Sequence, residues 1–171
     1  NKQDFQIFAD YVASIVQYWE VIPIINGMKV EAYKSAFSGD GWTVSEDNSE
    51  LRVLVDRIPY PVRKDYIDQN YEYRYNRYVL HFKVGELAVT ASREDLDYTK
   101  ATIQAIKNKL KIADTELTEI FNSKISSAKT YEEASIMSSQ FSGLTRKSLS
   151  WNGIEIKNLN YKGENITANG Y

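Results

Sequence analysis

Few of the side chains that usually carry catalysis or bind metals are present in this sequence. It has one histidine and no cysteine, so sites built on thiolates or on several histidines are excluded. His81 falls in a predicted strand, on the face opposite Leu80 and Phe82, where we interpret it as an exposed or capped strand histidine. The densest acidic cluster, Glu94-Asp95-Leu96-Asp97, lacks the spacing of a calcium loop and is typical of a helix start.

We therefore predict that the chain is not an enzyme and that it has neither a metal site nor a cofactor. A nucleophile needs a neighbouring base, and that base is most often histidine. Catalysis by carboxylates alone is compatible with the composition, although no pair of acids stands out. The Gly39-Asp40-Gly41 sequence lacks the later glycine and the lysine of a phosphate-binding loop, and we interpret it as a turn.

Residues 57–78 are distinctive because tyrosine and arginine recur throughout them. These residue types are enriched in protein interface hot spots, and they also stack on bases or sugars. Three interpretations stay open: an edge strand whose tyrosines pack on its own sheet, a protein interface, and a site for nucleic acid or glycan. The candidate residues of this segment are Tyr71, Tyr73, Arg74, Tyr75 and Arg77.

The composition is that of a globular protein with no general attraction to polyanions. The 171 residues include 21 basic and 23 acidic side chains, which give a formal net charge of −2, and 43% are hydrophobic. A chain of this length can bury a core, and a protein so near neutrality has no global field for nucleic acid or anionic membranes. We expect no nucleic-acid partner. The absence of cysteine is compatible with the cytosol and with the periplasm.

The elements that position these residues begin with a predicted amphipathic helix at 4–19, where apolar residues recur every three or four positions. Alternating apolar residues predict strands at 28–37, 42–44, 51–55, 71–84 and 87–91. The expected turns between them are Gly39-Asp40-Gly41, Asp47-Asn48-Ser49 and Gly85-Glu86. Ile58-Pro59-Tyr60-Pro61 is expected to break the sheet, and a short helix is expected at 62–69.

The strongest periodic signal, which runs from Leu96 to Ile120, predicts one unusually long helix. Its apolar residues alternate between spacings of three and four, and a helix of roughly 28 residues is about 42 Å long. Ser92, followed by Asp95, resembles a capping box before it. The stripe fits either a core helix or a coiled coil with another chain. Its candidate interface residues are Ile103, Ile106, Leu110, Leu117 and Ile120.

The rest of the chain predicts a second helix at 130–143, which begins with the capping box Thr130-Tyr131-Glu132-Glu133, and strands at 154–161 and 165–168. Asn152-Gly153-Ile154-Glu155-Ile156 echoes Asn26-Gly27-Met28-Lys29-Val30, and each follows an amphipathic helix. We predict an α/β fold of the α+β kind, in which an antiparallel sheet packs against amphipathic helices. It forms a single domain over 1–171 or two fused helix-strand-strand units, 1–91 and 92–171.

Residues 149–161, followed by 164–170, resemble the strand pair after the coiled-coil region in the PilN, PilO and GspL-type periplasmic domains of type IV pilus and type II secretion machines. A looser echo covers 23–55. The resemblance implies ferredoxin-like units, homo- or heterodimerisation with proteins of the same envelope assembly, and no catalysis or cofactor. It also implies an anchor to the inner membrane before Asn1. The chain departs from that family in its length and in its Tyr-rich insert.

The leading hypothesis is therefore a non-enzymatic scaffold domain in the periplasm, which acts through protein contacts of the long helix and of the Tyr/Arg segment. One alternative is a pilin-like or surface-adhesive subunit. Another is a nucleic-acid or glycan binder that uses residues 57–78.

Overall fold

The computed structural model describes residues 2–25, 27–46, 50–67, 73–141, 143–145, 147–157, 160–161 and 164–165. It is a mixed α+β protein with a mostly antiparallel sheet and one long helix, as predicted. The chain divides into two compact units, 1–110 and 111–171, and the boundary falls within the long helix.

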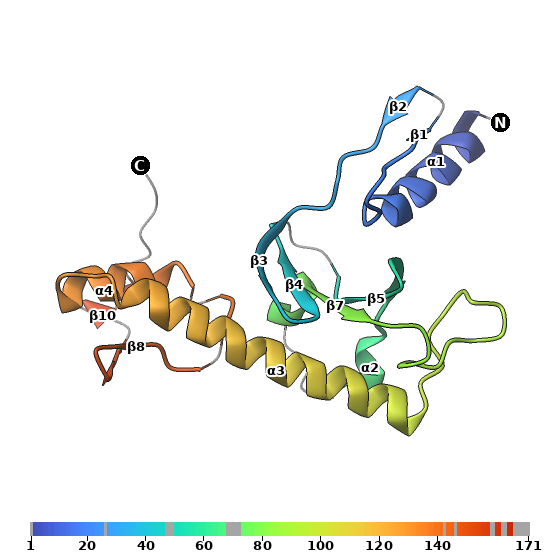
Figure 1. Cartoon of the computed structure of the whole chain (residues 1–171). Coiled ribbons are helices and arrows are strands. Elements are labelled where there is room, and N and C mark those ends of the chain that lie inside the picture. The colour runs from blue at the N-terminus through green and yellow to red at the C-terminus, as the bar shows by residue number, and fades with distance from the viewer. Residues whose placement is uncertain are drawn as a thin grey trace. The chain divides into compact units, whose positions relative to one another are not determined.

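Unit 1 contains a five-stranded sheet, a two-stranded hairpin and several helices (Figure 1). Its helices are α1 (Lys2–Val16), α2 (Lys64–Ile67), the 3-10 helix η1 (Tyr73–Arg77) and the first part of α3 (Lys100–Ile125). Its strands are β1 (Ile24–Ile25), β2 (Met28–Lys29), β3 (Ser35–Gly39), β4 (Trp42–Ser45), β5 (Arg52–Val55), β6 (Ile58–Pro61) and β7 (Tyr78–Phe82).

The sheet has the strand order β3-β4-β7-β5-β6, and all neighbours are antiparallel except the parallel pair β5 and β7. The predicted pairing of 42–44 with 51–55 through a turn at 47–49 is wrong, because β7 lies between β4 and β5. The turn residues themselves lie outside the described part of the chain. Strand 28–37 is also not continuous, since it is divided into β2 and β3.

The two faces of the sheet differ because successive side chains of a strand point to opposite sides. One face is apolar and almost fully buried; its side chains include Trp42, Val44, Val53, Tyr78 and Leu80. The first part of α3 lies against it, since Ile106 is buried and the Lys109 ammonium is 4.4 Å from the Phe82 ring centroid. The other face is more polar and carries Thr43, Ser45, Arg52 and His81.

Strand β6 contains both prolines that we expected to break the sheet, so that prediction is wrong. Pro59 pairs with Leu54 and Pro61 with Arg52, at the outer edge of the sheet. An edge strand needs hydrogen bonds on one side only, so the missing N–H groups of proline are tolerated there. The short helix predicted at 62–69 is present as α2.

The Tyr-rich stretch predicted as a strand is a 3-10 helix over Tyr73–Arg77, and only Tyr78–Phe82 is a strand. The prediction of a return strand at 87–91 is also wrong. This part of the described chain forms only isolated bridges, between Val84 and Leu87 and between Val89 and Leu96.

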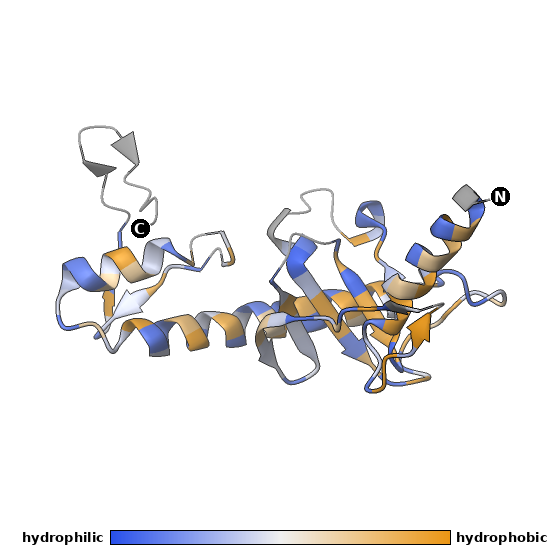
Figure 2. Ribbon diagram, turned by 90° about the horizontal axis from the view of Figure 1, so that it is seen from above, coloured by the Kyte–Doolittle hydropathy of each residue, from blue (hydrophilic) through white to orange (hydrophobic). Residues whose placement is uncertain are grey.

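Helix α3 begins at Lys100, later than predicted, and Ser92 does not cap it. The side chain of Thr99 accepts a hydrogen bond from the Thr102 amide at 3.2 Å and caps the helix instead. Residues 88–97 form a loop, closed by the Thr90 amide on the Asp95 carbonyl at 2.9 Å. Polar and apolar bands alternate along the helix (Figure 2).

Unit 2 contains the second part of α3, helix α4 (Tyr131–Ser139) and paired two-residue strands. The strands are β8 (Ser150–Trp151), β9 (Ile154–Glu155), β10 (Asn160–Tyr161) and β11 (Glu164–Asn165). The predicted capping box is confirmed, because the Thr130 side chain accepts from the Glu133 amide at 3.2 Å. The helix ends at Ser139, however, before the predicted residue 143, and the predicted strand 154–161 is divided into β9 and β10.

The core of unit 2 lies between α3 and α4. Leu117, Phe121 and Ile125 are fully buried, and Phe121 stacks on Phe141 with ring centroids 4.2 Å apart. Asn152 and Gly153 both have positive φ, 50° and 78°, which suits the tight turn between β8 and β9. The similar sequence around Gly27 also lies in a hairpin, in unit 1. There β1 pairs with β2, and Gly27 has φ 81°.

Gly41→Ala should destabilise unit 1 by more than about 1 kcal/mol, because Gly41 has φ 73° and only glycine adopts that region without strain. The added methyl carbon would also lie 2.7 Å from the Lys109 ammonium, which donates to the His81 carbonyl at 2.7 Å. Denaturant unfolding measures the change. Gly143→Ala is the control, since its φ is not in the positive region and no atom lies within 4 Å of the added carbon. Equal losses in both variants would contradict the interpretation.

Candidate functional site

The structure does not bring the predicted Tyr/Arg residues together as one row. Tyr71 lies outside the described residues, and Tyr73 and Arg74 belong to η1. The Tyr75 ring meets Tyr78 edge-on, with centroids 5.8 Å apart. Arg77 donates to backbone carbonyls of the sheet, at 2.8 Å to Ser45 and 3.0 Å to Glu46.

Other arginines and tyrosines of the segment lie elsewhere in unit 1. Arg63 lies over the rings of Tyr66 and Tyr98, which stack with centroids 4.4 Å apart. Burial raises the pKa of the Tyr98 phenol, whose oxygen accepts from the Arg63 amide at 2.8 Å. Arg57 forms an ion pair with Glu20, beyond the end of α1. Each of these contacts joins two parts of the same chain. The described arginine and tyrosine side chains of the segment therefore lie at several separate places in unit 1.

The predicted helix interface is largely covered by the chain itself. Ile106 belongs to unit 1, where it is fully buried, and Leu110 is 4% exposed in the same unit. Leu117 is fully buried in unit 2. Ile103 and Ile120 are half-buried. The stripe therefore contributes mainly to the cores of the two units.

The largest concentration of exposed apolar side chains in the described part of the chain lies in the first 24 residues, where the sequence predicted an amphipathic helix at 4–19. We call it the N-terminal apolar surface: Phe5, Ile7, Phe8, Tyr11, Trp19, Val21 and Ile24. These are seven of the thirteen large apolar side chains that are exposed in the described part of the chain. Their exposed fractions range from 44% at Trp19 to 82% at Val21.

Helix α1 exposes the first four of these residues because its apolar positions cover more than half of its circumference, at about 100° per residue. Ala9 and Val16 are buried and attach the helix to unit 1, whereas Ile7, Phe8 and Tyr11 are more than 60% exposed. At the end of the helix, the Tyr33 amide donates to the Gln17 carbonyl at 2.9 Å. The predicted apolar stripe is present, but unit 1 covers only part of it.

A second candidate site lies on the polar face of the sheet, where two hydroxyl groups and one imidazole lie in successive contact. The Tyr33 hydroxyl is 3.0 Å from the Thr43 hydroxyl, which is 3.4 Å from the Nε2 atom of His81. Burial, together with the charge of Lys109, lowers the pKa of His81, so the imidazole is neutral at pH 7. Burial raises the pKa of Tyr33 to about 12.

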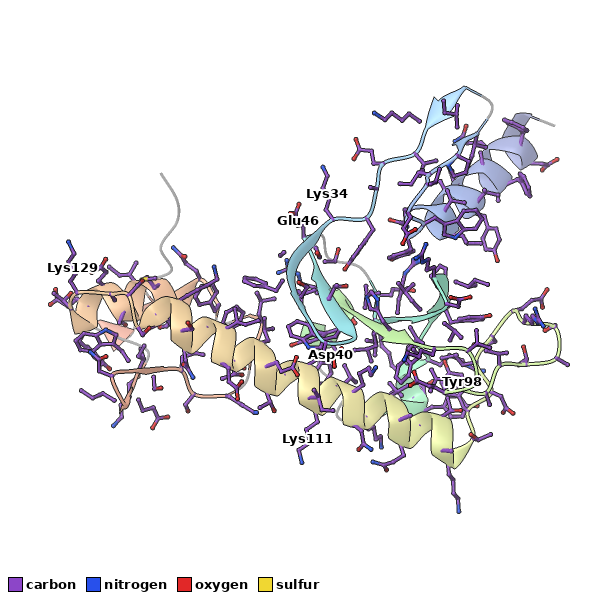
Figure 3. All side chains as sticks on the ribbon, viewed as in Figure 1. Lys34, Asp40, Glu46, Tyr98, Lys111 and Lys129 are labelled. Carbon is purple, nitrogen blue, oxygen red and sulfur yellow. The ribbon has the colours of Figure 1, made fainter. Side chains whose placement is uncertain are left out.

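Beside these polar side chains there is a polar cavity of about 410 Å³. The rings of Tyr18 and Tyr33, 4.9 Å apart, line it with Ser45 and Arg52. Lys34 and Glu46 line it from neighbouring strand ends, where the Glu46 amide donates to the Lys34 carbonyl at 3.3 Å (Figure 3). These residues come from separate parts of the sequence, so no local pattern could have predicted their meeting.

Within the described residues, no group of three or more histidine, aspartate or glutamate side chains is placed to hold a metal ion. The helices described here also include none that is long and apolar enough to cross a membrane. Comparisons with protein-family models, with curated proteins and with solved structures find no match to the chain.

Tyr33→Phe should remove one phenol that ionises near pH 12 from the absorbance titration of the folded protein. Because the folded pKa is raised above the usual 10.0, neutral Tyr33 stabilises the fold up to pH 10, and this contribution is lost as the pH rises toward 12. The free energy of unfolding of Tyr33→Phe should therefore fall less steeply over that range. Tyr11→Phe, at an exposed position, is the control and should leave the ionisation near pH 12 unchanged.

Proposed function

We propose that the chain is a non-enzymatic docking domain that associates with other protein chains through its N-terminal apolar surface. The observation that carries this proposal is the exposure of seven large apolar side chains between residues 5 and 24. Concentrations of exposed apolar groups are typical of surfaces that another molecule covers. Covering them would contribute roughly 25 cal/mol for each Å² of apolar area removed from water.

Aromatic residues strengthen the case for a protein partner. Phe5, Phe8, Tyr11 and Trp19 belong to the surface, and tyrosine and tryptophan are the residues most enriched at interface hot spots. The alternative of a nucleic-acid or glycan platform at residues 57–78 has less support, because the described tyrosines and arginines of that segment contact the chain itself.

The assembly that we propose is a scaffold of the bacterial envelope, of the type IV pilus or type II secretion kind, with the domain in the periplasm as a homo- or heterodimer. Its support is the resemblance of residues 149–161 and 164–170 to PilN, PilO and GspL-type domains, and the long helix α3 that precedes them. The ferredoxin-like arrangement belongs to the same proposal. A ferredoxin-like unit has four strands, and the sheet of unit 1 shares its mixture of antiparallel strands and helices but has five.

Sedimentation velocity over a wide range of protein concentration tests the docking role. We expect the wild-type chain to self-associate and Ile7→Asn to shift the equilibrium toward the monomer, because Ile7 is 64% exposed and its replacement removes apolar contact area. Substitutions at exposed positions usually change stability little, so the variant should stay folded.

Ile136→Asn is the matched control, since Ile136 is 57% exposed on helix α4, outside the N-terminal apolar surface. It should associate as the wild type does. A wild-type chain that stays monomeric at every concentration, and binds no domain of an envelope assembly when the two are mixed, would contradict the proposal.

A further inference from the structure

We propose that unit 1 binds a small carboxylate in the polar cavity formed by the end of α1, the segment 31–34 and the polar face of the sheet. This site is separate from the N-terminal apolar surface and does not depend on the docking role. The cavity volume of about 410 Å³ lies within the range of small-molecule sites.

The first observation is the charge of Arg52, which lines the cavity and is half-buried. No carboxylate forms an ion pair with Arg52 among the residues that the structure describes. Its Nε atom is shielded from solvent and has no hydrogen-bond partner in that same part of the chain. The guanidinium therefore lines the cavity with no acid paired to it among the described residues, and an anion in the cavity would meet its terminal nitrogens and not the shielded Nε atom.

The second observation is the supply of hydroxyl donors around that guanidinium. The Tyr18 hydroxyl is hydrogen-bonded to Arg52, and burial raises the pKa of Tyr18 and Tyr33, so both phenols keep their protons at neutral pH. Ser45 is 5% exposed and adds a third hydroxyl to the cavity lining. The Tyr33 hydroxyl is hydrogen-bonded to Thr43 and Ser45, so an anion would replace one of these contacts to accept a hydrogen bond from a neutral hydroxyl.

The charge of the cavity lining selects a carboxylate over a phosphate. The planar fork of a guanidinium pairs with two oxygens of either group, so Arg52 alone does not discriminate between them. Glu31 and Glu46 also line the cavity and are exposed, so their negative charges oppose a dianion more than a monoanion. Lys34 offsets one of these charges.

Amide chemical shifts in a titration test the site. The probes are sodium acetate, sodium benzoate and inorganic phosphate, each at constant ionic strength. We expect saturable shifts around Tyr33, Ser45 and Arg52 with acetate and benzoate in the millimolar range, and weaker binding of phosphate. Phosphate that binds as tightly as the carboxylates would overturn the assignment, as would the absence of a saturable shift with either carboxylate.

Arg52→Gln should weaken carboxylate binding roughly tenfold or more, because it removes the half-buried cation of the cavity lining. Arg93→Gln removes the same charge from an exposed loop position and should leave the affinity unchanged. If Arg52→Gln does not fold, Tyr18→Phe provides the test: it keeps the ring against Tyr33 and removes one donor, so a severalfold loss of affinity is expected. Affinity that is equal in the wild type and in the folded variants would refute the site.

Discussion

The parallel pairing of β5 with β7 is the constraint on which the architecture of unit 1 depends. Val53 and Leu80 pair in its centre, and both are fully buried. Parallel neighbours need a long crossover connection, because no tight turn can join them. The chain leaves the sheet at the outer strand β6 and returns to its middle as β7, on the far side of β5. Most of the Tyr/Arg segment belongs to this connection, whose described residues form the short helices α2 and η1, whereas its first residues form β6.

Sequence patterns predicted helices better than strand order, because helix periodicity is local and strand pairing is not. The regular spacing in α3 was enough to predict its length, and the Thr130 capping box was enough to predict the start of α4. Ser92 carries a similar signal, yet the bridge between Val89 and Leu96 closes a loop there and delays the helix to Thr99. No local pattern indicates that β7 lies between β4 and β5.

The candidate sites could be predicted only in part. The apolar stripe of α1 is visible in the sequence, but a stripe that the chain covers looks the same as one that it leaves exposed. Burial of Ala9 and exposure of Phe8, one residue apart, depend on how much of the helix unit 1 covers. The polar cavity depends on contacts among Tyr18, which follows α1, Tyr33, which precedes β3, and Arg52 of β5; these residues are distant in the chain and meet only in the folded unit.

The two prolines of β6 have a consequence for the behaviour of the chain at high concentration. Each lacks the amide proton that an added backbone would need, so an intermolecular ladder cannot continue regularly from that border of the sheet. At the opposite border, β3 has neither proline nor charge between Ser35 and Gly39, although a bulge between Ser35 and Phe37 interrupts its regularity. Any fibril seeded by this sheet would therefore elongate from one side alone.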